Sequence, residues 1–173
     1  MLQDVVSVSL PVNERMRIKK NHFEPYNLTG KEKRICIVTG IHGDELEGQY
    51  VCYELIRRLS ENGHLLNGIV DIYPSMNPLG MDSIKREMPI FDLDMNMIFP
   101  GSETGAVAEH IAAAIMNDIK GADICIDIHA SNIFLREIPQ VRISEETAPK
   151  LLPYAKMLNV DFIWVHSSVT VME

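Results

Sequence analysis

The hydrophobic positions of this chain follow two patterns, and the change comes near residue 33. Before it, apolar and polar residues alternate over 6–10, and Met16 to Ile18 follow a turn at Asn13-Glu14. Alternation with a period of two predicts antiparallel strands. After it, the apolar runs 35–38 and 124–128 predict buried strands, and 69–73 predicts a further short strand.

Helical spacing of apolar residues separates these predicted strands. Between Glu45 and Leu59, the apolar positions recur at intervals of three and four residues, as on one face of a helix. The same spacing predicts a helix over 106–119, which Gly121 ends. In the rest of the chain, the pattern predicts a strand at 141–143, a helix at 148–158 and a strand at 162–165.

Residues 76–101 lie between the strand predicted at 69–73 and the helix predicted at 106–119. This segment contains five prolines and glycines and is interpreted as a long loop. Long loops in compact domains are often functional. Strands that alternate with helices predict an α/β fold, with three α/β/α layers around a mixed, mostly parallel central sheet. In such sheets, sites gather at the C-terminal ends of the strands.

Length and charge narrow the class of protein. The 173 residues are enough for one domain, taken as 1–173, with a normal share of apolar residues, 46%. A net charge of -8 and a pI of about 5.2 argue against partners such as nucleic acid or an anionic membrane. The N-terminus does not resemble a signal peptide, and no apolar run is long enough to span a bilayer. Together with three cysteines, an odd number, these features predict a cytoplasmic protein with reduced thiols.

Candidate metal ligands follow two of the predicted strands. His42 and Glu45 lie three residues apart in Gly40-Ile41-His42-Gly43-Asp44-Glu45, and His129 ends Asp127-Ile128-His129. If the two strands are neighbours, their loops meet at one edge of the sheet. Two imidazoles, one carboxylate and an open fourth position form a common catalytic zinc shell. A single H-x-x-E pattern is weak, however, and a histidine after a strand is more often a polar loop residue.

A third segment makes the pattern specific. It contains Asn77-Pro78, then Arg86, then residues 92–101 with the sequence DLDMNMIFPG. From about Ser7 to the last residue, the chain resembles the succinylglutamate desuccinylase and aspartoacylase family of zinc carboxypeptidase-like hydrolases. The family motifs G-x-H-G-x-E, N-P, Arg, D-x-N-R-x-F-P-G and D-x-H occur here in the same order.

The resemblance implies a carboxypeptidase-like fold and one Zn²⁺ per chain. It implies that His42, Glu45 and His129 are the zinc ligands, and that Asp94 orients a ligand histidine through its second nitrogen. Asp127 lies two residues before His129 and would point to the same side of a strand. Asp127 either supports the metal ligands or caps a neighbouring helix.

The resemblance also implies a reaction. Arg86 would bind substrate by polarising the scissile carbonyl, and Asn96 would bind the substrate carboxylate. Bound zinc activates water at neutral pH, so we expect a zinc-dependent amidohydrolase or deacylase that cleaves an N-acyl amino acid or a related amide. The alternatives are a zinc carboxypeptidase-like peptidase and a non-catalytic relative that binds zinc or a ligand.

The chain departs from the family pattern at two places. Met97 occupies the position of the family arginine, which holds a substrate carboxylate through two hydrogen bonds. The glutamate that acts as the family's general base would lie beyond residue 173, and Glu173 follows an unsuitable sequence for that role. We therefore expect a domain that lacks its C-terminal part, and exposed apolar surface would then favour a homo-oligomer.

Overall fold

The computed structural model of the chain describes residues 1–131 and 134–167. The chain forms two compact units, Met1–Ile133 and Phe134–Glu173, and each is described by itself. All the candidate site residues named above fall in the first unit, except Glu173, which lies outside the described residues. The assignment of 1–173 to a single catalytic domain stays a prediction.

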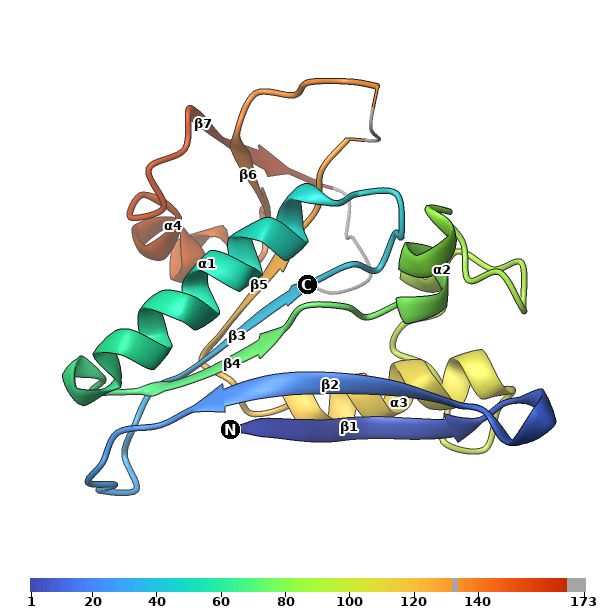
Figure 1. Cartoon of the computed structure of the whole chain (residues 1–173). Coiled ribbons are helices and arrows are strands. Elements are labelled where there is room, and N and C mark those ends of the chain that lie inside the picture. Colours follow the sequence, from blue (N-terminus) through green and yellow to red (C-terminus); the bar gives the residue numbers. More distant parts are fainter. Residues whose placement is uncertain (132–133, 168–173) are drawn as a thin grey trace. The chain divides into compact units, whose positions relative to one another are not determined.

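A five-stranded sheet forms the centre of the first unit (Figure 1). In spatial order it consists of β1 (Leu2–Ser9), β2 (Arg15–Phe23), β4 (Ile69–Tyr73), β3 (Arg34–Thr39) and β5 (Ile124–Ile128). The strands β3, β4 and β5 are parallel, whereas β2 pairs antiparallel with both β1 and β4. The predicted mixed sheet is therefore confirmed, and the alternating N-terminal segment supplies its antiparallel part.

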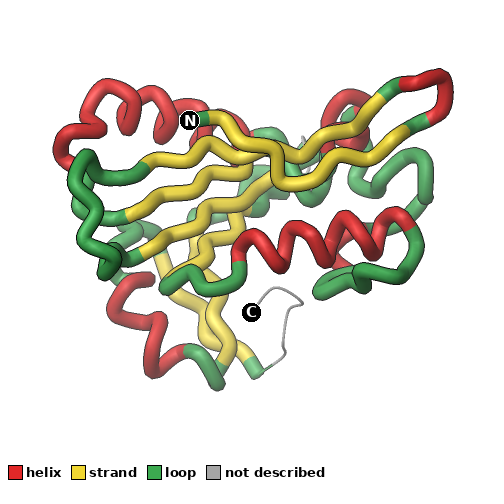
Figure 2. Tube along the Cα trace, turned by 90° about the horizontal axis from the view of Figure 1, so that it is seen from below, coloured by secondary structure: helices red, strands yellow, loops and turns green. Residues whose placement is uncertain are grey.

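Helices cover both faces of this sheet (Figures 1 and 2). The two long ones are α1 (Glu47–Asn62) and α3 (Val107–Ile119), and α2 (Pro78–Ser83) is short. Three single turns of 3-10 helix complete the unit, at Pro11–Asn13, Gly63–Leu65 and Met95–Met97. The prediction of an α/β fold with three layers is thus confirmed, with α1 and α3 as the outer layers.

Two close contacts show that α1 and α3 lie on opposite faces. The side chain of Thr39 on β3 lies against Gly48 of α1, where a Cβ atom would come within 1.9 Å of Oγ1 of Thr39. The hydroxyl of Tyr73 on β4 donates a hydrogen bond of 2.5 Å to Asp118 of α3. Tyr73 is in register with Val38, which precedes Thr39, and successive residues of a strand face opposite sides.

A buried polar network lies between the sheet and α3. The carboxylate of Asp71 is almost fully buried and accepts hydrogen bonds from Arg34, at 2.6 and 2.8 Å. It also lies 2.6 Å from Nδ1 of His22 and 3.5 Å from Nζ of Lys20. Lys20 in turn contacts Asp118 on α3, at 2.8 Å. Each buried charge therefore has an opposite charge beside it, as a low-dielectric interior requires.

The segment 76–101 differs from the loop that its prolines and glycines predict. It contains α2 and the 3-10 turn Met95–Met97, and both begin at a polar capping residue. The side chain of Asn77 accepts a hydrogen bond from the N–H of Gly80, and the side chain of Asp94 accepts one from the N–H of Asn96. Pro78 fits the first turn of a helix because that position needs no N–H donor. The prediction of one long loop was therefore wrong for these two stretches.

The second unit contains one strand–helix–strand motif. It consists of β6 (Gln140–Ser144), α4 (Ala148–Ala155) and β7 (Phe162–His166), and β6 pairs parallel with β7. Three of the five strand pairings among the described residues are therefore parallel. Within residues 1–131 and 134–167, no helix is long and apolar enough to cross a membrane.

Candidate metal centre

The turn between β3 and α1 carries the first two candidate ligands. Gly40 has a φ of +72°, a left-handed conformation that glycine adopts without steric cost, and so it turns the chain out of the strand. Gly43 packs so closely against α2 that a Cβ atom would lie 2.0 Å from the carbonyl carbon of Gly80. Asn77, fully buried, donates a hydrogen bond from its N–H to Gly40 O and one from its side chain to Ile41 O. The N-P motif therefore fixes the conformation of the ligand turn.

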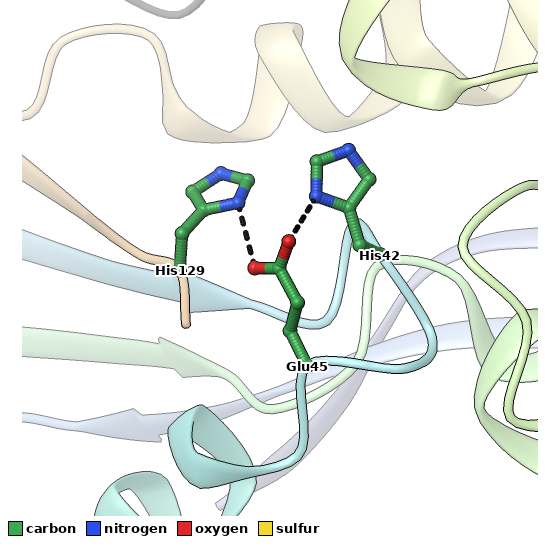
Figure 3. Close-up of side chains that lie close together, drawn as sticks. All are labelled: His42, Glu45 and His129. Atoms are coloured by element: carbon green, nitrogen blue, oxygen red, sulfur yellow. Dashed lines mark hydrogen bonds and ion pairs between the residues drawn. The ribbon is translucent and has the colours of Figure 1, made fainter. Parts of the chain in front are cut away.

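Glu45 lies between the two histidines (Figure 3). Its Oε1 is 2.8 Å from Nδ1 of His42, and its Oε2 is 3.0 Å from Nδ1 of His129. His129 follows β5, which neighbours β3 in the sheet, so the parallel pairing brings the two loops together. One ligand atom from each residue lies within 4.8 Å of the others. The predicted cluster of His42, Glu45 and His129 is thus present and could hold a metal ion.

Each histidine also has an aspartate on its other nitrogen. Nε2 of His42 lies 3.1 Å from Oδ1 of Asp94, and Nε2 of His129 lies 2.9 Å from Oδ2 of Asp127. A carboxylate on Nε2 leaves Nδ1 as the atom that can bind a metal. Of the two roles that the sequence left open for Asp127, the structure supports contact with His129.

The charges of the cluster depend on one another. Burial alone would raise the pKa of Glu45, but hydrogen bonds with His129 and His42 outweigh it and hold the pKa well below its usual range. Burial alone would lower the pKa of His129, but contacts with Asp127 and Glu45 raise it to about 10. A metal ion that takes Nδ1 of His129 must therefore displace a proton.

Arg86 lies at the exposed side of the cluster. Its guanidinium is 3.1 Å from Oδ2 of Asp94 and 3.5 Å from Oε1 of Glu45, and its side chain is 47% exposed. The guanidinium is therefore held by Asp94 while it remains partly open to solvent. Burial would raise the pKa of Asp94, but hydrogen bonds from the N–H of Asn96 and from His42, with the charge of Arg86, lower it.

Asn96 and Met97 lie in the 3-10 turn after Asp94. The N–H of Asn96 donates to Asp94 Oδ1, at 3.0 Å, and the N–H of Met97 donates to the carbonyl oxygen of Asp94. Met97 is 76% exposed. Both residues therefore belong to the segment that positions Asp94 and Arg86.

One contact of the cluster could not be found from the motifs. The N–H of Ala130 donates a hydrogen bond of 2.9 Å to Oε2 of Glu45. A backbone donor leaves no signal in residue type, and only its place directly after His129 hints at it. The contact lowers the pKa of Glu45 further and holds the carboxylate against the end of β5.

The fold and this group of ligands define a carboxypeptidase-like α/β protein with a candidate metal centre. Sequence comparison is more specific. Residues 31–170 match the profile of the succinylglutamate desuccinylase/aspartoacylase catalytic domain. The chain belongs to this family.

One sequence relative is the N-alpha-acetyl-L-2,4-diaminobutyric acid deacetylase of Halomonas elongata. It is 31% identical over 111 residues, which cover 64% of this chain and 32% of the relative. Among solved structures, a succinylglutamate desuccinylase/aspartoacylase from Rhodobacter sphaeroides superposes with a TM-score of 0.82 at 24% identity, over 98% of this chain and 53% of the other.

Two further structures resemble this fold. The product-bound ectoine utilization protein EutE (DoeB) from Ruegeria pomeroyi has a TM-score of 0.78 at 21% identity, over 98% of this chain and 53% of its own. A metallo-carboxypeptidase from Burkholderia cenocepacia has a TM-score of 0.63 at 18% identity, over 87% and 41%. The chain spans about half the length of the family structures and a third of the sequence relative.

Proposed function

We propose that this protein binds one Zn²⁺ through His42, Glu45 and His129 and hydrolyses the amide bond of a small N-acylated amino acid. The observation that carries the proposal is the position of Glu45, whose two oxygens each lie beside Nδ1 of a different histidine. Two nitrogens and a carboxylate suit zinc by ligand type, and three protein ligands leave a position for substrate.

The residues around the cluster have separate tasks in this proposal. When bound, zinc lowers the pKa of water and polarises the substrate carbonyl. Asp94 and Asp127 hold the imidazoles of His42 and His129 in the orientation that presents Nδ1. Arg86 donates to the carbonyl oxygen as negative charge develops there, because it is already fixed by Asp94 and partly open to solvent.

The name of one relative supports a proposal for the substrate class. The name of the Halomonas elongata relative describes removal of an acetyl group from a diamino acid. Asn96, in the 3-10 turn that Asp94 caps, would bind the carboxylate of the amino acid. We therefore propose an N-acyl amino acid with one carboxylate as the substrate, and assign the general base to none of the residues 1–131 and 134–167.

The first test measures the zinc content of the protein. Purified protein should contain about one zinc per chain by elemental analysis, and His42→Ala should lose it. The exposed His64, on a turn outside the cluster, provides the matched control, and His64→Ala should keep the metal. Zinc retained by His42→Ala would contradict the proposed ligands.

Activity is then measured as release of free amine from a panel of N-acetyl amino acids, with and without zinc. Metal-dependent release that His42→Ala abolishes would support a deacylase. Faster release from peptides than from N-acetyl amino acids would favour a carboxypeptidase-like peptidase instead. One zinc per chain without any hydrolysis would favour a non-catalytic, ligand-binding role.

A further inference from the structure

Thr39 lies where the two ligand-bearing loops leave the sheet. It is the last residue of β3 and the register partner of Ile128, the last residue of β5. Its side chain is fully buried, and its hydroxyl donates a hydrogen bond of 2.9 Å to the carbonyl oxygen of Ile128. The residue after Ile128 is His129. The hydroxyl therefore holds the backbone from which one candidate zinc ligand leaves the sheet.

The same side chain lies against the first turn of α1. A Cβ atom at Gly48 would come within 1.9 Å of Oγ1 and 2.9 Å of Cβ of Thr39. Gly48 is buried, so the helix approaches β3 as closely as a residue without a side chain allows. Glu45 lies three residues before Gly48, in the turn that leads into the helix. Thr39 therefore contacts both the helix that follows Glu45 and the strand that precedes His129.

The backbone of Thr39 is held from another side. Its carbonyl oxygen accepts a hydrogen bond of 3.1 Å from the N–H of Met76, a fully buried residue just beyond β4. A β-branched side chain such as threonine also has few allowed χ1 angles. With the backbone held and χ1 restricted, the hydroxyl has a defined direction toward Ile128.

The separation of Glu45 and His129 depends on this junction. Oε2 of Glu45 lies 3.0 Å from Nδ1 of His129 and accepts a hydrogen bond of 2.9 Å from the N–H of Ala130 (Figure 3). Glu45 and His129 are 84 positions apart in the chain, so the packing of β3, β5 and α1 sets their distance. Metal–ligand distances vary by only about 0.2 Å from their ordinary values. A small movement of the end of β5 against α1 would therefore weaken a metal site.

We propose that Thr39 is a positioning residue of the candidate zinc centre. Its hydroxyl holds the end of β5, and with it His129, at the distance from Glu45 that a shared metal ion requires. This inference rests on the proposed zinc ligands, but it concerns a residue outside the ligand set that acts through the Ile128 carbonyl. A hydroxyl with a merely structural role would stabilise the whole sheet and would not act on its ligand end in particular.

The first test compares three substitutions of Thr39. Serine keeps the hydroxyl and loses the methyl group, valine keeps the shape and loses the hydroxyl, and alanine loses both. In chelator competition, Thr39→Ser should bind zinc nearly as wild type does, and Thr39→Val and Thr39→Ala should bind it about tenfold more weakly. Thr147→Val is the matched control, because Thr147 also donates its hydroxyl to a backbone carbonyl, that of Ser144, in the second unit. It should leave zinc binding unchanged.

Amide hydrogen exchange, followed by NMR on metal-free protein, tests the junction without zinc. The N–H of Ala130 reports on the ligand end of β5, and the N–H of Asp123, which donates to the carbonyl oxygen of Arg34 at 2.8 Å, reports on the opposite end. Exchange at Ala130 should be several-fold faster in Thr39→Ala than in Thr39→Ser, with no difference at Asp123. Because serine and alanine differ only in the hydroxyl, this comparison holds even if valine disturbs the packing.

The two measurements separate this proposal from that of the zinc ligands. Wild type that binds no zinc would overturn the zinc centre. Equal exchange at Ala130 in Thr39→Ser and Thr39→Ala, or equal acceleration at Ala130 and Asp123, would overturn the role of Thr39. Equal zinc affinity in the serine and alanine variants would overturn it as well.

Discussion

Asp127 takes the same place behind His129 that Asp94 takes behind His42. The carboxylates lie 2.9 and 3.1 Å from Nε2 of their respective imidazoles, and the two Nδ1 atoms both face Glu45. The cluster is therefore nearly symmetric about the Glu45 carboxylate, although Asp94 caps a 3-10 turn and Asp127 lies in a strand.

We expect Asp127→Asn to weaken zinc binding about 10- to 100-fold, because an amide orients the imidazole less firmly and does not increase its basicity. A chelator competition assay measures the change. Asp82 lies at the exposed end of α2, so Asp82→Asn is the matched control and should bind zinc normally. An unchanged affinity in Asp127→Asn would mean that the contact with His129 is incidental.

Gly43→Ala should disrupt the ligand turn. A Cβ atom at Gly43 would lie 2.0 Å from the carbonyl carbon of Gly80 and 2.3 Å from its oxygen, so the backbone itself must move. We expect a loss of about 2 kcal/mol in the free energy of unfolding, together with weaker zinc binding. Gly63→Ala is the control, because nothing lies within 4 Å of its added Cβ atom. Equal stability of the two variants in urea denaturation would contradict this account.

The buried network under α3 predicts a dependence of stability on pH. Burial alone would raise the pKa of Asp71, but hydrogen bonds from His22 and Arg34, and the charge of Lys20, lower it. A carboxyl whose pKa is lower in the folded state stabilises the protein above its ordinary pKa of about 3.9. That contribution is lost as the pH falls through the folded-state value.

Asp71→Asn should therefore cost about 3 kcal/mol at pH 7, because it leaves buried cations without their partner. The difference from wild type, measured by urea denaturation, should shrink below about pH 4. Asp4, which forms a half-exposed ion pair of 3.8 Å with Arg17, is the control, and Asp4→Asn should cost less than about 1 kcal/mol. A difference that stays constant down to pH 2 would contradict the role given to the ionised carboxylate.

Met97 predicts the charge of the substrate. An arginine at this position would hold a carboxylate through two hydrogen bonds, which methionine cannot form, and N-acyl aspartate carries one carboxylate more than N-acyl alanine. Met97→Arg should therefore raise kcat/KM for N-acyl aspartate relative to N-acyl alanine by about tenfold, equivalent to about 1.4 kcal/mol. Met157 is similarly exposed, at 79%, and Met157→Arg is the control for added charge. Equal changes in both variants would show that Met97 does not contact the substrate.

Local sequence patterns predicted the strands of the sheet well. The bounds of β4 and β5 agree with the predicted 69–73 and 124–128, because these runs are short, mainly apolar and ended by proline or a polar turn. The helix predicted from Glu45 begins instead at Glu47. Glu45 is buried against two imidazoles and lies in the turn before the helix, and a helical spacing alone cannot show that.

In the segment 76–101, the prediction from residue types alone was partly wrong. Its prolines and glycines predict a loop, but Pro78 starts α2, and Gly80 is needed because the side chain of Asn77 and the backbone at Lys85 leave no room for a Cβ atom. These requirements come from contacts between segments, which composition does not encode.

The sequence by itself determined the ligand types, their order and the family, because strand-forming runs and the H-x-x-E and D-x-H motifs are local features. Only the tertiary structure decided which nitrogen of each histidine faces Glu45, that Asp127 supports His129, and that Cys36 lies beside Cys125. The contact of His129 with Glu45 and the pairing of Cys36 with Cys125 both depend on the register of β3 against β5, which joins residues nearly 90 positions apart in the chain. Such pairing is set by the packing of the whole sheet against α1 and α3, and no local pattern specifies it.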